Sequence, residues 1–151
     1  MRTYLALALC SAVTFASAAG KPYDEAADAK AEIQSALAQA RQADLPVLVV
    51  FGANWCGDCQ VLDMAFKTGA SAPLIHAHFE VVKVNVGKFD RNVDIAKSYG
   101  LPLQNGIPAV AVLSPQGRVV YATRAGELAD ARNMGDTAIY DFFARVAGVK
   151  P

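Results

Sequence analysis

The sequence predicts an α/β domain in which one mixed sheet of about four strands is flanked by helices. Short apolar runs rich in β-branched residues alternate with segments of helical periodicity, which is typical of a βαβ unit. The last two runs are separated only by "SPQG", so they predict an antiparallel hairpin. A chain of 151 residues with 54% hydrophobic content can form one domain with a closed core. We therefore expect an extra N-terminal helix, then βαβ, then ββα.

The first elements follow from the spacing of the apolar residues. Residues 24–44 have acidic residues in the first turn and apolar residues at helical spacing, and they predict a helix. "PVLVVF", residues 46–51, is a continuous apolar run, as expected for a strand buried on both faces. Helical spacing returns from Cys56 to about Lys67, which places Cys56 at a helix N-terminus. Residues 71–79 are expected to form a further short helical piece or turn.

The second half supplies the remaining strands and two helices. "EVVKVNV", residues 80–86, predicts a strand, and residues 91–100 predict a helix that ends at a glycine. Residues 107–113 and 118–124 predict two strands that pair across the proline and glycine turn. Residues 136–148 are amphipathic and predict a closing helix.

The N-terminus has the features of a secretory signal peptide. The positive charge of Arg2 precedes an apolar stretch and the small-x-small pattern "ASA" at residues 16–18. The apolar stretch is about a dozen residues, short of the ~20 that span a bilayer, so an uncleaved anchor fits less well. We therefore expect a signal peptide over residues 1–18, with cleavage near residues 18–20. The domain is then residues 21–151, acting in the periplasm or outside the cell.

The charge balance argues against two classes of partner. Lysine and arginine together number 14, as do aspartate and glutamate. Neither a nucleic acid nor an anionic membrane surface would be attracted by this composition. No membrane span is expected in the mature chain either.

The cysteine pattern favours reactivity over structural cross-linking. Cys10 would leave with the signal peptide, and lipid attachment there fits less well because Leu9, not a small residue, precedes it. The mature chain would keep Cys56 and Cys59, which are separated by two residues. A disulfide between them would close almost no loop, so it would stabilise the chain little. A redox-active dithiol explains the pair better.

A zinc half-site or an inert bridge is the alternative for these cysteines. His76 and His78 are the only candidate further ligands, and on a helix their spacing points them apart. Surface or capping histidines are therefore the better interpretation, and no metal is expected.

These residues together resemble the thioredoxin superfamily. "WCGDC", residues 55–59, is similar to the family's Trp-Cys-x-x-Cys active site, and "GIP", residues 106–108, is similar to the segment that holds a cis proline opposite it. "KVNV" and "SPQGRVV" follow in the expected order. The resemblance covers about residues 30–147 and implies a thioredoxin fold.

The resemblance implies a thiol-disulfide oxidoreductase with Cys56 and Cys59 as catalytic residues. A helix N-terminus favours a thiolate, so Cys56 would attack a partner's disulfide and form a mixed disulfide. Cys59, one helical turn later, would then displace the partner and close the Cys56–Cys59 disulfide. That redox-active disulfide is the only cofactor this chemistry needs.

The same resemblance implies which residues surround the cysteines. Trp55, Gly57 and Asp58 would shape the site. The backbone at Ile107 and Pro108 would bind an extended segment of the partner, much as an added strand binds a sheet.

Three departures from the family pattern affect the expected chemistry. Val50 stands where the family usually has a buried aspartate, whereas Lys83 matches the family's buried lysine and is a candidate proton-transfer helper. The segment "LPLQN", residues 101–105, is longer than in plain thioredoxins. Asp58 replaces the usual proline, and its charge is predicted to raise the pKa of the Cys56 thiol.

Within this class, a reductase or thiol-exchange role on protein disulfides is favoured. The segment between Cys59 and Pro108 is too short for the helical insertion of the strong periplasmic oxidases. A membrane electron donor would recharge the dithiol, because free reductant is scarce outside the cytoplasm. The alternative is a thioredoxin-like binding module that holds a partner protein or a metal ion through the two cysteines.

Overall fold

The sheet is mixed and four-stranded, as predicted. The computed structural model describes residues 20–149, so the predicted signal peptide lies outside the described residues. The strands are β1 (Val47–Gly52), β2 (Glu80–Asn85), β3 (Ala109–Leu113) and β4 (Val119–Ala122). They lie in the order β2-β1-β3-β4, with β1 parallel to β2 and antiparallel to β3, and β3 antiparallel to β4.

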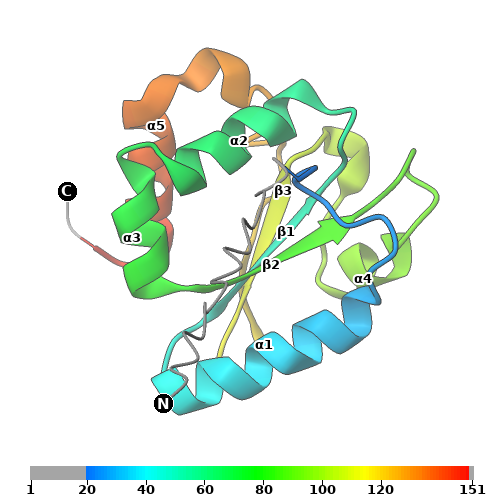
Figure 1. Ribbon diagram of the computed structural model, residues 1–151, viewed down its shortest axis with the longest axis vertical. Coiled ribbons are helices and arrows are strands. Elements are labelled where there is room, and N and C mark those ends of the chain that lie inside the picture. The colour runs from blue at the N-terminus through cyan, green and yellow to red at the C-terminus, as the bar shows by residue number, and fades with distance from the viewer. Residues whose placement is uncertain (1–19, 150–151) are drawn as a thin grey trace, which may run out of the picture.

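Helices cover both faces of this sheet. They are α1 (Ala29–Ala43), α2 (Gly57–Lys67), α3 (Ser71–His78), α4 (Val93–Ser98) and α5 (Ala131–Val146), with a 3-10 turn, η1 (Leu103–Asn105). In Figure 1, α1 and α4 lie on one side of the sheet and α2, α3 and α5 on the other. The order βαβ then ββα, preceded by an extra helix, confirms the predicted architecture.

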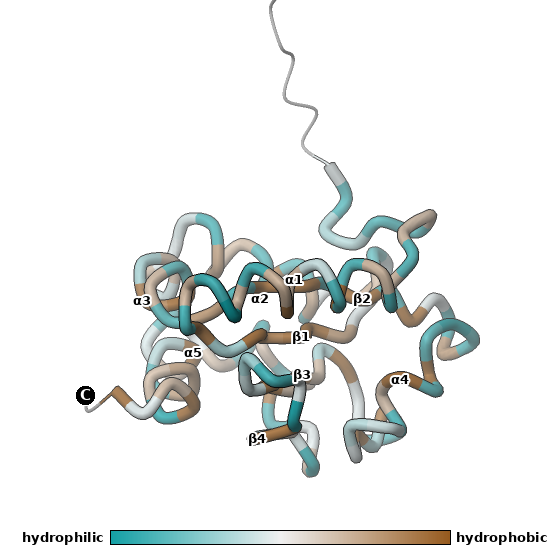
Figure 2. The backbone as a smooth tube through the Cα atoms, turned by 90° about the horizontal axis from the view of Figure 1, so that it is seen from below, coloured by the Kyte–Doolittle hydropathy of each residue, from teal (hydrophilic) through white to brown (hydrophobic). Residues whose placement is uncertain are grey.

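The central strand β1 carries the core on both of its faces. All six of its residues are buried, which agrees with the continuous apolar run in the sequence. Val49 and Phe51 pack in one cluster with Ile33, whereas Leu48 and Val50 pack in a second cluster on the side of α2 and α5. Figure 2 shows the hydrophobic tube of β1 running through the middle of the molecule. The Cys-x-x-Cys motif therefore follows a strand that is buried along its whole length.

The first helix starts later than predicted. It begins at Ala29 and not at residue 24, because Asp28 caps it: its carboxylate accepts a hydrogen bond from the amide of Ala31 at 3.1 Å. The acidic residues before Asp28 belong to a non-helical segment. We call residues 20–28 the strap.

The last helix starts earlier than predicted and is bent. It begins at Ala131, whereas the sequence predicts residue 136. Gly135 has φ 73° and ψ 163°, which interrupts the helix, so periodicity is regular only after this residue. The helix predicted over residues 91–100 is also shorter, because Asn92 is in the left-handed region just before α4.

Candidate active site around Cys56 and Cys59

The two cysteines lie where β1 gives way to α2. Cys56 is the N-cap of α2, and the amide of Cys59 donates to Cys56 Sγ at 3.1 Å. The two residues form a disulfide with a Cα–Cα distance of 5.2 Å, and both are buried. A sulfur that already accepts a helix N-terminal amide is placed so that its thiolate is stabilised when the disulfide opens.

The "GIP" segment lies against the first cysteine, as expected from the sequence. Cys56 Sγ is 3.6 Å from the carbonyl oxygen of Ile107, and the Ile107–Pro108 peptide bond is cis. The side chain of Ile107 is buried, and Pro108 leads directly into β3. The backbone at Ile107 is thus brought to the reactive sulfur from a distant part of the chain.

Trp55 is exposed and is held by the loop after β2. Its Nε1 donates to the carbonyl oxygen of Gly87 at 2.7 Å, and its ring makes an edge contact with Phe89 at a centroid distance of 6.0 Å. Trp55 is 57% exposed and Phe89 is 45% exposed, so this aromatic pair presents apolar surface to solvent beside Cys56. Phe89 also has φ 63°, an unusual conformation for a bulky residue. The sequence analysis did not identify Phe89, although an aromatic residue in an otherwise polar loop can indicate a binding surface.

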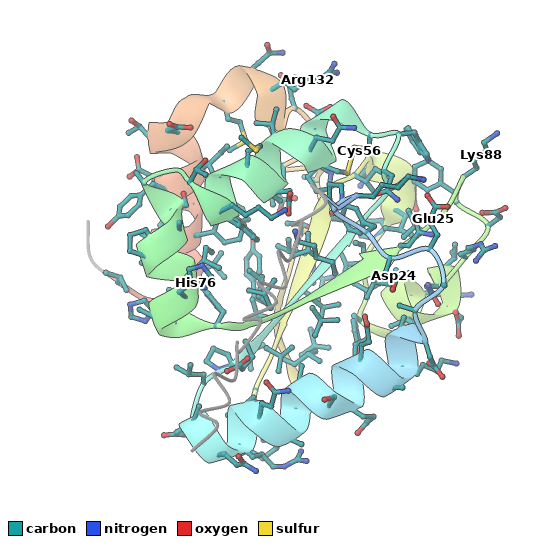
Figure 3. All side chains as sticks on the ribbon, viewed as in Figure 1. Asp24, Glu25, Cys56, His76, Lys88 and Arg132 are labelled. Atoms are coloured by element: carbon teal, nitrogen blue, oxygen red, sulfur yellow. A yellow bond between two sulfur atoms is a disulfide. The ribbon has the colours of Figure 1, made fainter. Side chains whose placement is uncertain are left out.

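Asp58 is buried and paired with the start of α5. Its Oδ1 accepts hydrogen bonds from the backbone amide of Arg132 at 3.0 Å and from Arg132 Nε at 3.2 Å. The Arg132 side chain also packs over Gly57, where an added Cβ would be 3.3 Å from Arg132 Cδ. The sequence predicts a carboxylate acting alone on the Cys56 thiol, whereas the structure adds a cation that offsets it. Figure 3 shows Cys56 and Arg132 at the same end of the molecule.

Lys83 faces α2, where it finds a partner that sequence reasoning missed. It forms an ion pair with Asp63, a buried residue four positions after Cys59 on α2. Lys67 Nζ also lies 2.7 Å from Asp63 Oδ2. Burial lowers the pKa of Lys83, which is half-buried. Val50 is the register partner of Lys83 on β1, so the carboxylate missing from β1 is supplied by α2.

The histidines lie away from the cysteines. His76 and His78 are in the last turn of α3, and Figure 3 shows His76 at the opposite end of the molecule from Cys56. Within residues 20–149, no group of three or more His, Cys, Asp or Glu side chains is arranged to hold a metal ion. None of the helices in the same described range is both long enough and apolar enough to span a membrane.

Two sequence comparisons bear on this site. Residues 28–115 match the Thioredoxin-like family, and this range includes both cysteines and Pro108. A thioredoxin of Porphyra purpurea is 37% identical over 76 residues, which are 50% of this chain and 64% of that protein. The match thus spans less than two thirds of that thioredoxin.

Solved structures share the fold. The disulphide isomerase from Xylella fastidiosa Temecula1 superposes with a TM-score of 0.82 at 51% identity, covering 85% of this chain and 98% of that chain. A structure described as DsbH Oxidoreductase gives a TM-score of 0.52 at 16% identity, covering 78% of this chain and 82% of that chain. At that identity the second similarity concerns the fold alone.

Proposed function

Because the chain belongs to the thioredoxin-like family, we propose that it is a thiol-disulfide oxidoreductase that reduces or exchanges disulfides of other proteins outside the cytoplasm. The observation that carries the proposal is the position of Cys56: it caps α2, its sulfur accepts the Cys59 amide, and Cys59 is close enough to pair with it. The similarity to a disulphide isomerase at 51% identity supports the same class of reaction.

The reduced form would begin the reaction with Cys56. Its thiolate attacks one sulfur of a partner's disulfide; a new bond joins Cys56 to the partner, and the partner's other sulfur leaves as a thiolate. Cys59 then attacks Cys56 Sγ, the bond to the partner breaks, and the Cys56–Cys59 disulfide forms. The partner gains two electrons and the protein loses two. A reduced dithiol protein, with a membrane electron donor as its source, would restore the starting state.

The surroundings of Cys56 fit the binding of a polypeptide. The Ile107 carbonyl oxygen is 3.6 Å from the attacking sulfur, so a partner segment that pairs with this backbone would bring its disulfide to Cys56. The exposed aromatic pair, Trp55 and Phe89, would contact a side chain of the same segment. Gly57 leaves room for Arg132 beside the site.

The Asp63–Lys83 pair gives Lys83 a proposed role in handling the proton of the resolving thiol. Asp63 and Cys59 are four residues apart on α2, so their side chains share one face of the helix. A buried carboxylate there could accept a proton from Cys59, and Lys83 would stabilise its charge.

Export is proposed from the signal-peptide features of residues 1–18. Full-length chain expressed in a bacterium should be recovered from the periplasm or the medium, with a mass that shows loss of residues up to position 18–20. Recovery of the uncleaved chain from the cytoplasm would contradict it.

Reduction of insulin disulfides by dithiothreitol, with and without the protein, tests the enzymatic proposal. We expect the wild-type protein to accelerate insulin precipitation and the Cys56→Ser variant to leave the uncatalysed rate unchanged. The same preparations are analysed for zinc and copper. Stoichiometric metal without insulin turnover would instead favour the binding module.

A further inference from the structure

The strap returns the chain to the active-site end of β1. Tyr23 is fastened there by Asn54, the residue before Trp55: the Tyr23 amide donates to Asn54 Oδ1 at 2.9 Å, and Asn54 Nδ2 donates to the Tyr23 carbonyl oxygen at 2.8 Å. Arg91 Nη1 adds a hydrogen bond to the carbonyl oxygen of Glu25 at 3.1 Å. The strap is therefore held both by the loop after β1, which contains Asn54, and by the loop after β2, which contains Arg91.

The Tyr23 side chain enters the core beneath the disulfide. It is only 2% exposed, and it belongs to the same cluster of buried residues as Cys56 and Cys59. A Cβ on Gly52 would collide with the Tyr23 hydroxyl and would come within 2.9 Å of Cys59 Sγ. The hydroxyl oxygen and the sulfur therefore approach the same point beside Gly52. A glycine at the end of a buried strand is expected where another group must come this close.

We propose that Tyr23 is a positioning residue for Cys59, and that its hydroxyl donates a hydrogen bond to the Cys59 sulfur once the disulfide has opened. The inference rests on the proposed thiol-disulfide function and adds a residue outside the Cys-x-x-Cys motif to it. Cys59 is 1% exposed, so a thiolate at this position has little access to water and is stabilised by a protein donor.

The hydroxyl remains a donor throughout the reaction. Burial raises the pKa of Tyr23 far above its ordinary value, so the group stays protonated at neutral pH. In the resolving step the Cys59 thiolate attacks Cys56 Sγ, the bond from Cys56 to the partner breaks, and the partner's sulfur leaves with the electron pair. Tyr23 gives up no proton; it stabilises the attacking thiolate.

Three carboxylates on α2 and in the strap, the segments that contain Cys59 and Tyr23, already have partners. Asp58 bonds with Arg132 of α5. Asp63 of α2 is paired with Lys83 of β2 and with Lys67. In the strap, Glu25 accepts a hydrogen bond from Asn54 Nδ2 at 2.8 Å. The Tyr23 hydroxyl carries no charge, and its contribution can be separated from that of the charged groups by removing a single oxygen.

Tyr23→Phe in a Cys56→Ser background isolates the effect of the Tyr23 hydroxyl on Cys59. The ring and its packing are kept, and Cys59 is left as the only titrating thiol of the mature chain. We expect thiolate absorbance to show the Cys59 pKa raised by about one unit, which is about tenfold less thiolate at neutral pH. With Cys56 restored, mixed disulfides should resolve about tenfold more slowly, while the attack by Cys56 keeps its rate.

Tyr121→Phe is the matched control. Tyr121 is half-buried and packs in the other cluster, against Phe142, so its hydroxyl should not influence Cys59. A Cys59 pKa that Tyr23→Phe leaves unchanged, or that moves equally with Tyr121→Phe, would overturn the proposal.

A second measurement needs no tyrosine substitution. With ¹³Cζ-labelled tyrosine in the Cys56→Ser protein, the Tyr23 resonance should shift with the midpoint of the Cys59 titration, and that of Tyr121 should not. A Tyr23 resonance that ignores the titration would contradict the hydrogen bond. Both pKa measurements are independent of turnover, so the inference can fail while insulin reduction succeeds, and insulin reduction can fail while the hydrogen bond is found.

Discussion

The guanidinium of Arg132 lies beside Gly57, and its Nε donates to Asp58 Oδ1 at 3.2 Å. This places a positive charge next to the dipeptide that separates the cysteines. A cation there favours the Cys56 thiolate directly, and it also offsets the Asp58 carboxylate, which by itself would disfavour that thiolate. The effect on the Cys56 thiol is therefore the combined effect of the Arg132 cation and the Asp58 carboxylate.

Arg132→Ala should raise the pKa of the Cys56 thiol. The substitution removes the nearby cation and leaves the Asp58 carboxylate without its side-chain partner, and both changes disfavour the thiolate. The effect should be below about one unit, because Arg132 is exposed and solvent screens it. Thiolate absorbance in the Cys59→Ser background measures it.

Arg145→Ala is the control for this change, since Arg145 is an exposed arginine in the last turn of the same helix. Arg145→Ala should leave the pKa of the Cys56 thiol unchanged. A fall in that pKa with Arg132→Ala, or an equal shift in both variants, would contradict the account of Asp58 and Arg132.

At the scale of the elements, Asp63 joins α2 to β2. Its carboxylate is buried, it pairs with Lys83 across the two elements, and it also binds Lys67 on its own helix. Helix α2 contains Cys59 and is capped by Cys56, so this pair holds the helix next to the disulfide against the sheet.

Asp63→Ala should lower the free energy of unfolding by about 2 kcal/mol, because it leaves the half-buried Lys83 ammonium without a carboxylate. Urea unfolding of the oxidised protein measures the loss. Adding Lys83→Met should restore part of it, since the unpaired charge is then removed as well. Asp94→Ala serves as the control, because its pair with Lys30 is exposed and should matter little. Equal stability of Asp63→Ala and the wild type would show that the pair does not hold α2.

For the whole molecule, apolar periodicity was enough to predict the order of the strands and helices. The continuous run before the motif identified the central strand, and "SPQG" identified the hairpin, in which the Gly117 amide donates to the Ser114 carbonyl oxygen at 2.8 Å. Both signals are local. The ends of α1 and α5 were misplaced, because the cap at Asp28 and the left-handed Gly135 override the hydrophobic pattern.

The residues of the site also differ in whether a local sequence pattern identifies them. Cys56, Cys59 and Pro108 were identified from motifs whose spacing is fixed along the chain. Arg132 was not, because it meets Asp58 across 74 positions of sequence. Tyr23 and Asp63 were missed for a related reason: neither belongs to a motif, and only the packing of the strap and of β2 gives them a role.

The division of labour between the two cysteines is the central claim, and trapping of mixed disulfides tests it most directly. Affinity-tagged Cys59→Ser and Cys56→Ser variants are expressed, thiols are blocked at lysis, and the purified proteins are compared by non-reducing gels. With Cys56 attacking and Cys59 resolving, Cys59→Ser should accumulate partner proteins that dithiothreitol releases, and Cys56→Ser should trap few or none. Equal trapping by both variants, or more by Cys56→Ser, would contradict the account.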